Sequence, residues 1–179
     1  GGVSMVQLRE KESSTREFVE RAIRLKEVLT PYGVPLIIND RVDVALAADA
    51  DGVHVGQSDM PYEMVKRLLP EGKIIGLSVE SPEQVLEANN YDLDYVAASP
   101  VFSTTTKTNT IVEWGLDGLR WIRSVSRHPL VAIGGIHSNN VASICKAGAD
   151  SVAVISAIVS ADDPERAARE LLEKSGEPH

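Results

Sequence analysis

Two aspartates, Asp40 and Asp59, each follow a short apolar run and carry a side chain that can hold a divalent cation. If these runs are neighbouring parallel strands, the carboxylates meet at one edge of the sheet and must share a proton or a cation. Proteins hold Mg²⁺ with one or two carboxylates, completed by waters and substrate phosphates. The alternatives are structural: Asp59 would cap a helix that begins near Pro61, and Asp40 would be a turn residue after Asn39.

Three polar side chains alternate at the end of the first apolar run: Gln7, Arg9 and Lys11. Alternate residues of an extended strand point to the same side, so two cations and an amide would converge. Arginine offers forked donors and lysine a point charge, a combination that suits a polyanion. The alternative is a solvated strand edge with Glu10 as a neighbouring charge.

A second phosphate site is predicted from segments that follow later apolar runs. The pair Gly134-Gly135 and residues 155–157 would offer backbone N–H groups and a short helix start to an anion. Residues 104–107, three threonines and a lysine, add hydroxyl donors and a mobile ammonium. The alternatives are a plain tight turn at the glycines and an exposed threonine-rich loop.

The remaining reactive side chains predict structure rather than chemistry. His54 lies inside an apolar run, which favours a buried, hydrogen-bonded histidine. We expect His128 and His137 at the surface or in loops, and Cys145 as a packing residue on a helix. No Ser-His-Asp or Cys-His arrangement is readable, so no protein nucleophile is predicted.

Seven short runs rich in valine and isoleucine must position these residues. Near-continuous apolar runs are typical of strands buried on both faces, as in parallel sheets. The segments between them carry helix starts, including the capping box of Ser14 and Glu17, Ser81 before Pro82, Ser138 before a helix at about 141, and an aspartate before Pro164. The runs span residues 5–8, 35–38, 52–55, 74–77, 95–98, 130–133 and 151–155.

Alternation of strands and helices places the chain in the α/β class, as one domain over residues 1–179. The choice is between an open doubly wound sheet and a closed (β/α)8 barrel. No Gly-x-Gly-x-x-Gly follows the first run, so a dinucleotide-binding open sheet has no support. Seven strands are one short of a TIM barrel, and the chain starts Gly1-Gly2-Val3, so we expect the first βα unit to be missing here.

Composition excludes several classes of partner. The formal net charge of −8 argues against binding to nucleic acid or an anionic membrane, because no net field attracts phosphate polymers. A single cysteine rules out an internal disulfide and a cysteine-cluster metal site, and fits the cytoplasm. No apolar run approaches the about 20 residues of a membrane span, and no signal peptide is read. The composition does not exclude small phosphorylated ligands as partners, and it does not exclude a homo-oligomer.

Taken together, these residues resemble the thiamin phosphate synthase family, over nearly the whole chain and in order. The set is specific, although no single stretch is. The matching stretches are residues 7–11 (QLREK), 38–41 (INDR), 52–59 (GVHVGQSD), 76–78 (GLS), 100–107 (PVFSTTTK), 132–136 (AIGGI) and 153–156 (AVIS).

The resemblance implies a Mg²⁺-assisted transferase that joins hydroxymethylpyrimidine pyrophosphate to hydroxyethylthiazole phosphate and releases pyrophosphate. The implied metal ligands are Asp40 and Asp59. The implied contacts of the pyrimidine pyrophosphate are Gln7, Leu8, Arg9, Glu10, Lys11, Asn39, Ser78 and Lys107, of which Arg9, Lys11, Ser78 and Lys107 are the catalytic residues. The implied contacts of the thiazole phosphate are Thr104, Thr105, Thr106, Gly135, Ile155 and Ser156.

Two departures and two rivals accompany this resemblance. Thr105 stands where many members have proline, and members carry a strand before residue 1, so a longer native chain supplies it or the fragment is poorly active. One rival is the related thiazole tautomerase, which has a histidine where this chain has Pro100. The other rival is a phosphate-ligand sensor without catalysis on the same scaffold. The long loop 100–114 is expected to act as a lid over the substrates.

Overall fold

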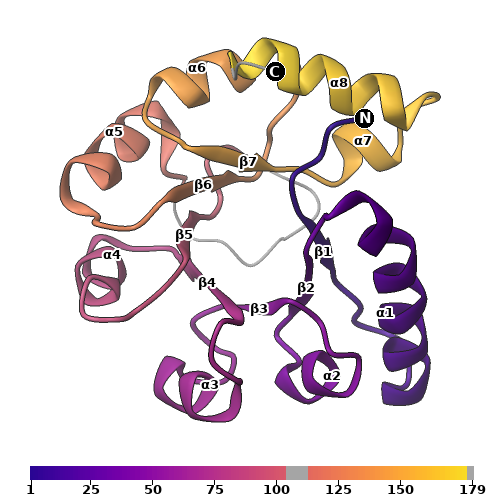
Figure 1. Cartoon of the computed structure of the whole chain (residues 1–179). Helices are drawn as coiled ribbons and strands as arrows, with labels where there is room; N and C mark the ends of the chain where they lie inside the picture. The colour runs from indigo at the N-terminus through magenta and orange to yellow at the C-terminus, as the bar shows by residue number, and fades with distance from the viewer. Residues whose placement is uncertain (104–112, 177–179) are drawn as a thin grey trace. The chain divides into compact units, whose positions relative to one another are not determined.

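The computed structural model describes residues 1–103 and 113–176. Two compact units are distinguished, one formed by Ser4–Leu77 and the other by Ser78–His179 together with Gly1–Val3. Both alternate strands with helices along the chain, as Figure 1 shows by colour from indigo to yellow. This confirms the α/β class predicted from the seven apolar runs, while the single domain over 1–179 stays a prediction.

The first unit contains four parallel strands in the order β1-β2-β3-β4. Val6 of β1 lies opposite Leu36, and Val53 of β3 lies opposite Ile75. In sequence order its elements are β1 (Val6–Leu8), α1 (Thr15–Leu29), the 3-10 turn η1 (Thr30–Tyr32), β2 (Leu36–Asn39), α2 (Val42–Ala47), β3 (Gly52–Val55), α3 (Tyr62–Leu68) and β4 (Ile74–Val79), whose last two residues belong to the second unit.

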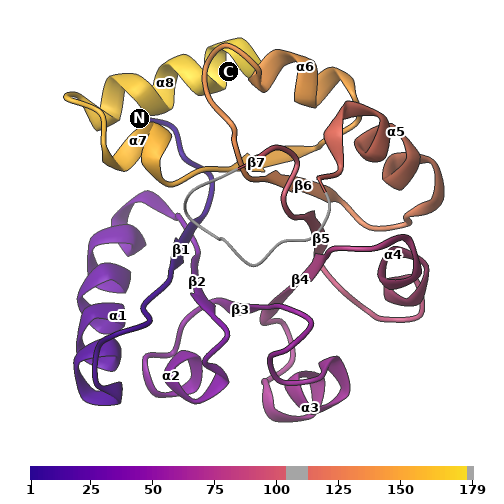
Figure 2. The same ribbon diagram turned by 180° about the vertical axis from the view of Figure 1, so that it is seen from behind.

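The second unit contains three parallel strands in the order β5-β6-β7, with helices packed beside them (Figure 2). Ala97 of β5 lies opposite Val131, which in turn lies opposite Ser151 of β7. In sequence order its elements are α4 (Pro82–Ala88), β5 (Tyr95–Ala98), α5 (Gly115–Val125), β6 (Leu130–Ile133), α6 (Val141–Lys146), β7 (Ser151–Ala153), α7 (Ser156–Val159) and α8 (Pro164–Ser175).

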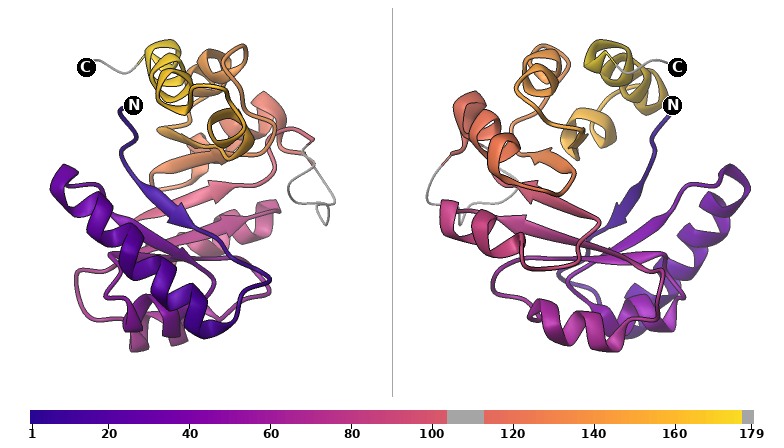
Figure 3. Two further views of the ribbon diagram at one scale, coloured as in Figure 1. Left: turned by 90° about the vertical axis from the view of Figure 1, so that its right-hand side faces the viewer. Right: turned by 60° about the vertical axis from the view of Figure 1, so that its left-hand side comes forward.

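Burial explains why the strands could be recognised in the sequence as apolar runs. Leu36, Ile37 and Ile38 of β2 are fully buried, and all four residues of β3 are buried as well. A parallel strand covered on both faces has no exposed side on which polar residues alternate. In the first unit, α1 lies in front of the strands in the left view of Figure 3 and buries Phe18 and Ala22. Burial of a phenylalanine, leucine or isoleucine side chain contributes about 1.5–3 kcal/mol of hydrophobic stabilisation.

Helix starts follow the predicted capping residues with one exception. Ser14 and Glu17 form the reciprocal capping box of α1, and the Ser81 hydroxyl accepts the N–H of Gln84. α6 begins near residue 141, as predicted, but the expected capping role of Ser138 is wrong. Residues 138–140 form a turn, and the helix begins at Val141 after Asn140, whose side chain is used in the turn instead of as a cap.

The same pair of hydrogen bonds between an aspartate and a leucine occurs in both units. The Asp51 carboxylate accepts the N–H of Leu36 at 2.8 Å, and the Asp51 N–H donates to the Leu36 carbonyl at 2.8 Å. Asp150 makes the same two bonds with Leu130, at 2.7 and 2.8 Å. In each case the residue before a strand fixes the first residue of the preceding strand, so the register of the pair is set at its start.

The part of the chain that is described holds seven strands, and the eighth strand of the expected barrel stays a prediction. Across the same residues, every helix is too short or too polar to span a bilayer.

Candidate functional site

The carboxylate of Asp40 is the centre of the polar cluster in the first unit. The Lys11 ammonium forms an ion pair with its Oδ2, and the Asn39 amide donates to the same oxygen at 3.0 Å. The Asp40 side chain is only 14% exposed, whereas that of Lys11 is 50% exposed. The structure therefore brings together three predicted site residues from the loop after β1 and the end of β2.

The backbone fixes the direction of the Asp40 carboxylate. Asp40 has φ 54°, in the left-handed region that few residues other than glycine adopt, although aspartate tolerates it better than most. Its N–H donates to the His54 carbonyl on β3 at 2.8 Å, and the Arg41 N–H donates to the Asn39 carbonyl at 2.8 Å. Asp40 is a turn residue, as one alternative predicted, and that turn also presents its carboxylate to Lys11.

Lys11 reaches this cluster from a loop rather than from a strand. β1 ends at Leu8, so Arg9 and Lys11 lie beyond the strand. The predicted alternation is still seen in solvent exposure, because Gln7, Arg9 and Lys11 are exposed. The Glu10 carboxylate accepts the N–H groups of Lys11 and Glu12 at 3.0 and 3.3 Å and pairs with an arginine of α1. These backbone N–H groups, led by that of Glu12, lower the pKa of Glu10.

Asp59 lies in the turn after β3. Its Oδ2 accepts the Gly56 N–H at 2.7 Å, and its own N–H donates to the Gly56 carbonyl at 3.2 Å. The alternative role of Asp59 as a helix cap is wrong, because the residue before α3 is Pro61 and that helix has no side-chain cap. Since β2 and β3 are paired and parallel, Asp40 and Asp59 follow the carboxyl ends of neighbouring strands, as predicted.

These residues fit a magnesium ion by their donor chemistry. Asp40 and Asp59 offer hard carboxylate oxygens, and Asn39, whose amide donates to Asp40, carries a neutral oxygen. Asp40 already has a cation, the Lys11 ammonium, against its largely buried carboxylate. Among the described residues, no three acidic, histidine or cysteine side chains gather as a closed metal site. The set matches an ion that completes its shell with waters and phosphate oxygens rather than with protein ligands alone.

The glycine pair of the second unit forms a turn that no other residue fits. Gly134 and Gly135 have φ 101° and 65°, and a Cβ on Gly135 would lie 2.7 Å from the Cβ of Phe102. The Phe102 N–H donates to the Gly134 carbonyl at 3.2 Å, and the Asn140 amide donates to the Gly135 carbonyl at 2.8 Å. Sequence reasoning missed Asn140, whose only signal was its place three residues after His137.

The other predicted residues of the second unit are placed as follows. Ile155 and Ser156 are exposed at the start of α7, and Ser78 is buried near the end of β4. The carbonyl of the next residue, Val79, accepts the Ser99 N–H at 3.3 Å and the indole N–H of Trp114 at 3.1 Å. The predicted residues Thr104, Thr105, Thr106 and Lys107 lie outside the described part of the chain.

Two histidines were predicted with different success. His54 is buried within β3, as expected. His128 was expected at the surface or in a loop. The surface location is wrong, because the side chain is buried with both ring nitrogens against backbone carbonyls. Its polar neighbours Arg127 and Ser126 gave no signal of burial.

The fold and these strand-end residues define a class: an α/β enzyme of parallel strands with its polar residues after their carboxyl ends. A model of the thiamine monophosphate synthase family matches residues 1–158. The chain is 53% identical over 171 residues to a thiamine-phosphate synthase of Albidiferax ferrireducens, covering 96% of this chain and 78% of that protein. It is 51% identical over 172 residues to the one of Vibrio parahaemolyticus, at 96% and 84% coverage. The chain therefore belongs to the thiamine monophosphate synthase family.

Solved structures agree with this assignment. A thiamine phosphate pyrophosphorylase from Pyrococcus furiosus superposes with a TM-score of 0.90 at 42% identity, covering 98% of this chain and 84% of that one. An orotidine 5'-phosphate decarboxylase from Pyrococcus horikoshii has a TM-score of 0.71 at 21% identity, covering 98% and 88%. The second likeness shows the fold alone.

Proposed function

We propose that this protein is a thiamin-phosphate synthase, a transferase of thiamin biosynthesis. It would couple hydroxymethylpyrimidine pyrophosphate to hydroxyethylthiazole phosphate, giving thiamin phosphate and pyrophosphate. The observation that carries the proposal is the cluster of Lys11, Asn39 and Asp40, because it places an ammonium, an amide and a largely buried carboxylate together in a chain of this family. A diphosphate–magnesium complex needs these three donor types.

Asp40 and Asp59 would hold Mg²⁺ through their carboxylates. The Gly56 N–H occupies Oδ2 of Asp59 and leaves Oδ1, which has no hydrogen-bond partner among the described residues, to face a cation. When bound, Mg²⁺ supplies positive charge against the diphosphate as it departs. The left-handed backbone at Asp40 keeps its carboxylate in place without any substrate, so little reorganisation is needed on binding.

The diphosphate would be bound by residues 7–11 with Asn39, Ser78 and Lys107. Arg9 and Lys11 donate charge-assisted hydrogen bonds to its oxygens, which stabilises the negative charge that builds up as the C–O bond to the pyrimidine breaks. Lys107 adds a third cation. No protein nucleophile is required if the pyrimidine departs as a cation and the thiazole nitrogen captures it, so the work of the chain is binding, orientation and exclusion of water.

The thiazole phosphate would be bound by Thr104, Thr105, Thr106, Gly135, Ile155 and Ser156. Gly135 would contribute its backbone N–H, and the hydrogen bond from the Asn140 amide to its carbonyl holds the turn that carries this N–H.

The seven parallel strands support a (β/α)8 barrel as the complete fold, and its eighth βα unit stays a prediction. The cytoplasmic location and a homo-oligomeric state stay predictions as well. The proposed partners are two small phosphorylated substrates, with neither nucleic acid nor a membrane.

The test is a coupled assay on the purified chain with both substrates and Mg²⁺. We expect release of pyrophosphate and appearance of thiamin phosphate in equal amounts, both abolished by a chelator and restored by added Mg²⁺. A tautomerase would isomerise a thiazole without releasing pyrophosphate. A sensor would bind ligand and form no product. Either result would overturn the proposal.

A further inference from the structure

We propose that Lys11 is a placeholder cation that changes partners: it pairs with Asp40 while the site is empty and moves to the diphosphate when Asp40 takes up magnesium. Metal and anion binding are then positively coupled through a single side chain. This inference rests on the proposed function, because it assumes that Asp40 is a metal ligand.

The contacts at Asp40 carry the first step. Lys11 and Asn39 both donate to Oδ2, so one of the two oxygens that Asp40 offers to a metal already carries a full positive charge. A divalent ion and an ammonium on one carboxylate repel each other strongly in a partly buried setting. Lys11 therefore has to leave Oδ2 for a metal to bind there with its full affinity.

The two partners differ in their freedom to move. Asp40 is held by its left-handed backbone and by the hydrogen bond from its N–H to the His54 carbonyl. Lys11 has a flexible four-carbon side chain that is half exposed. The moving group is therefore the ammonium rather than the carboxylate.

The loop that carries Lys11 is built to stay in place while its side chain moves. Glu10 binds the N–H groups of Lys11 and Glu12 and pairs with Arg21 of α1, so the loop backbone is tied independently of Asp40. An anion binding beside this loop gives the displaced ammonium a new partner. By thermodynamic linkage, if bound metal raises the affinity for the anion by some factor, bound anion raises the affinity for the metal by the same factor.

The test measures Mg²⁺ binding alone, by calorimetry on the full chain without substrates. Lys11→Met removes the competing ammonium and should tighten Mg²⁺ binding by about fivefold, which corresponds to the upper range for loss of one exposed ion pair. Lys11→Arg keeps the charge and should bind Mg²⁺ within about twofold of the wild type.

Arg9→Met is the matched control, because it removes a cation from the same loop without touching the Asp40 pair. An equal gain in Arg9→Met would assign the effect to net charge and overturn the inference. So would Mg²⁺ affinity in Lys11→Met that is unchanged or weaker. If the wild type and Lys11→Met both fail to bind Mg²⁺, the proposed metal site itself is wrong and the inference falls with it, a result distinct from the other two.

Discussion

The ring of His128 lies with Nε2 2.9 Å from the carbonyl oxygen of Ala88, the last residue of α4. Its Nδ1 lies 3.1 Å from the carbonyl oxygen of Leu93. A carbonyl can only accept, so a ring N–H is the donor wherever one of these contacts is a hydrogen bond. The side chain thereby joins the end of a helix to the segment before β5.

We expect His128→Leu to lower the free energy of unfolding by about 1–3 kcal/mol for each carbonyl left without a donor. Chemical denaturation of the full chain measures this loss. The control is His137→Leu, at an exposed position, which should change stability by less than about 0.5 kcal/mol. Equal stability of the two variants would show that the buried histidine makes no net contribution.

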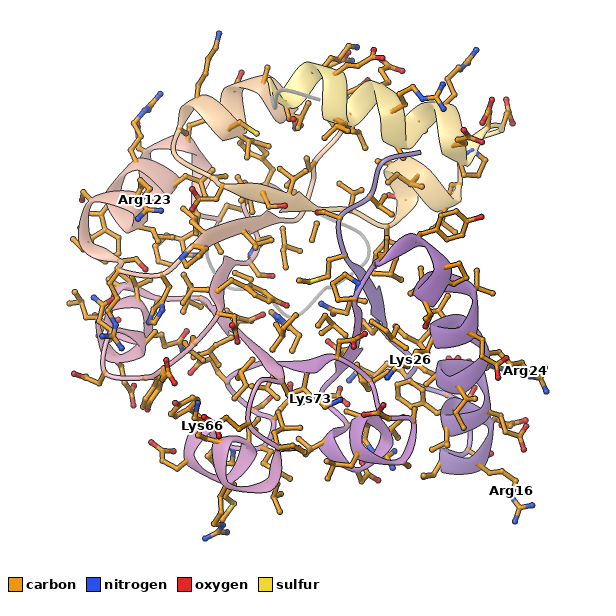
Figure 4. The ribbon with its side chains drawn as sticks, in the orientation of Figure 1. Arg16, Arg24, Lys26, Lys66, Lys73 and Arg123 are labelled. Carbon is orange, nitrogen blue, oxygen red and sulfur yellow. The ribbon has the colours of Figure 1, made fainter. Side chains whose placement is uncertain are left out.

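Asp49 gives the first unit a dependence on acid. Its carboxylate accepts from Lys26 and Lys73 at 2.8 and 2.7 Å, and Figure 4 shows both lysines turned inward while Arg16 and Arg24 point outward from α1. The hydrogen bonds from Lys26 and then Lys73 lower the pKa of Asp49 from 3.8 to about 2. Because the pKa is lower in the folded state, its stabilisation is present above 3.8 and is lost as the pH falls toward 2.

Asp49→Asn should remove this dependence while keeping the backbone, since asparagine also tolerates the φ of 47° at this position. Denaturation between pH 2.5 and 6 should give a stability difference from the wild type that is constant above about pH 5 and shrinks below it. Lys73→Met, which removes one of the two donors, should show a smaller part of the same trend. A difference that stays constant over the whole range would contradict the assignment.

Gly135→Ala should destabilise the chain by more than Gly33→Ala does. The two glycines have nearly the same φ, 65° and 64°, so a Cβ strains the backbone equally, by about 1–2 kcal/mol. At Gly33 nothing lies within 4 Å of the added Cβ, whereas at Gly135 it meets Phe102 and Ser103 below 3 Å. The difference in unfolding free energy between the variants therefore measures the close approach alone, and equal losses would refute it.

Asp40→Asn should reduce Mg²⁺-dependent formation of thiamin phosphate by about 100-fold or more, the usual loss for one electrostatic group at a reacting centre. Steady-state kinetics with both substrates, at a series of Mg²⁺ concentrations, is the measurement. Asp117→Asn is the matched control, because that carboxylate is 97% exposed on α5 and should leave turnover unchanged. Full activity in Asp40→Asn would remove the residue from the proposed metal site.

The sequence predicted the strands well because burial on both faces leaves an unbroken apolar signature. Leu36, Ile37 and Ile38 are fully buried and read as a strand without any partner being known. The order of the site residues along the chain also predicted that Asp40 and Asp59 follow neighbouring strands, which requires only that parallel strands pair in sequence.

Contacts between distant residues were not predictable in the same way. Nothing in the sequence pairs Lys11 with Asp40, 29 positions later, because Asn39-Asp40 indicates a turn but not the direction in which the turn aims the carboxylate. His128 was misjudged because its burial depends on two carbonyls of other elements rather than on apolar neighbours. Both results depend on backbone geometry, which periodicity does not encode.

The aspartates that precede β3 and β7 have a consequence for which substitutions these two positions tolerate. Asp51 and Asp150 make the same pair of bonds to the first residue of the preceding strand, at the end of the connections 48–51 and 147–150 that follow α2 and α6. An asparagine at either position retains a side-chain oxygen for the N–H of Leu36 or Leu130, whereas an alanine removes that acceptor.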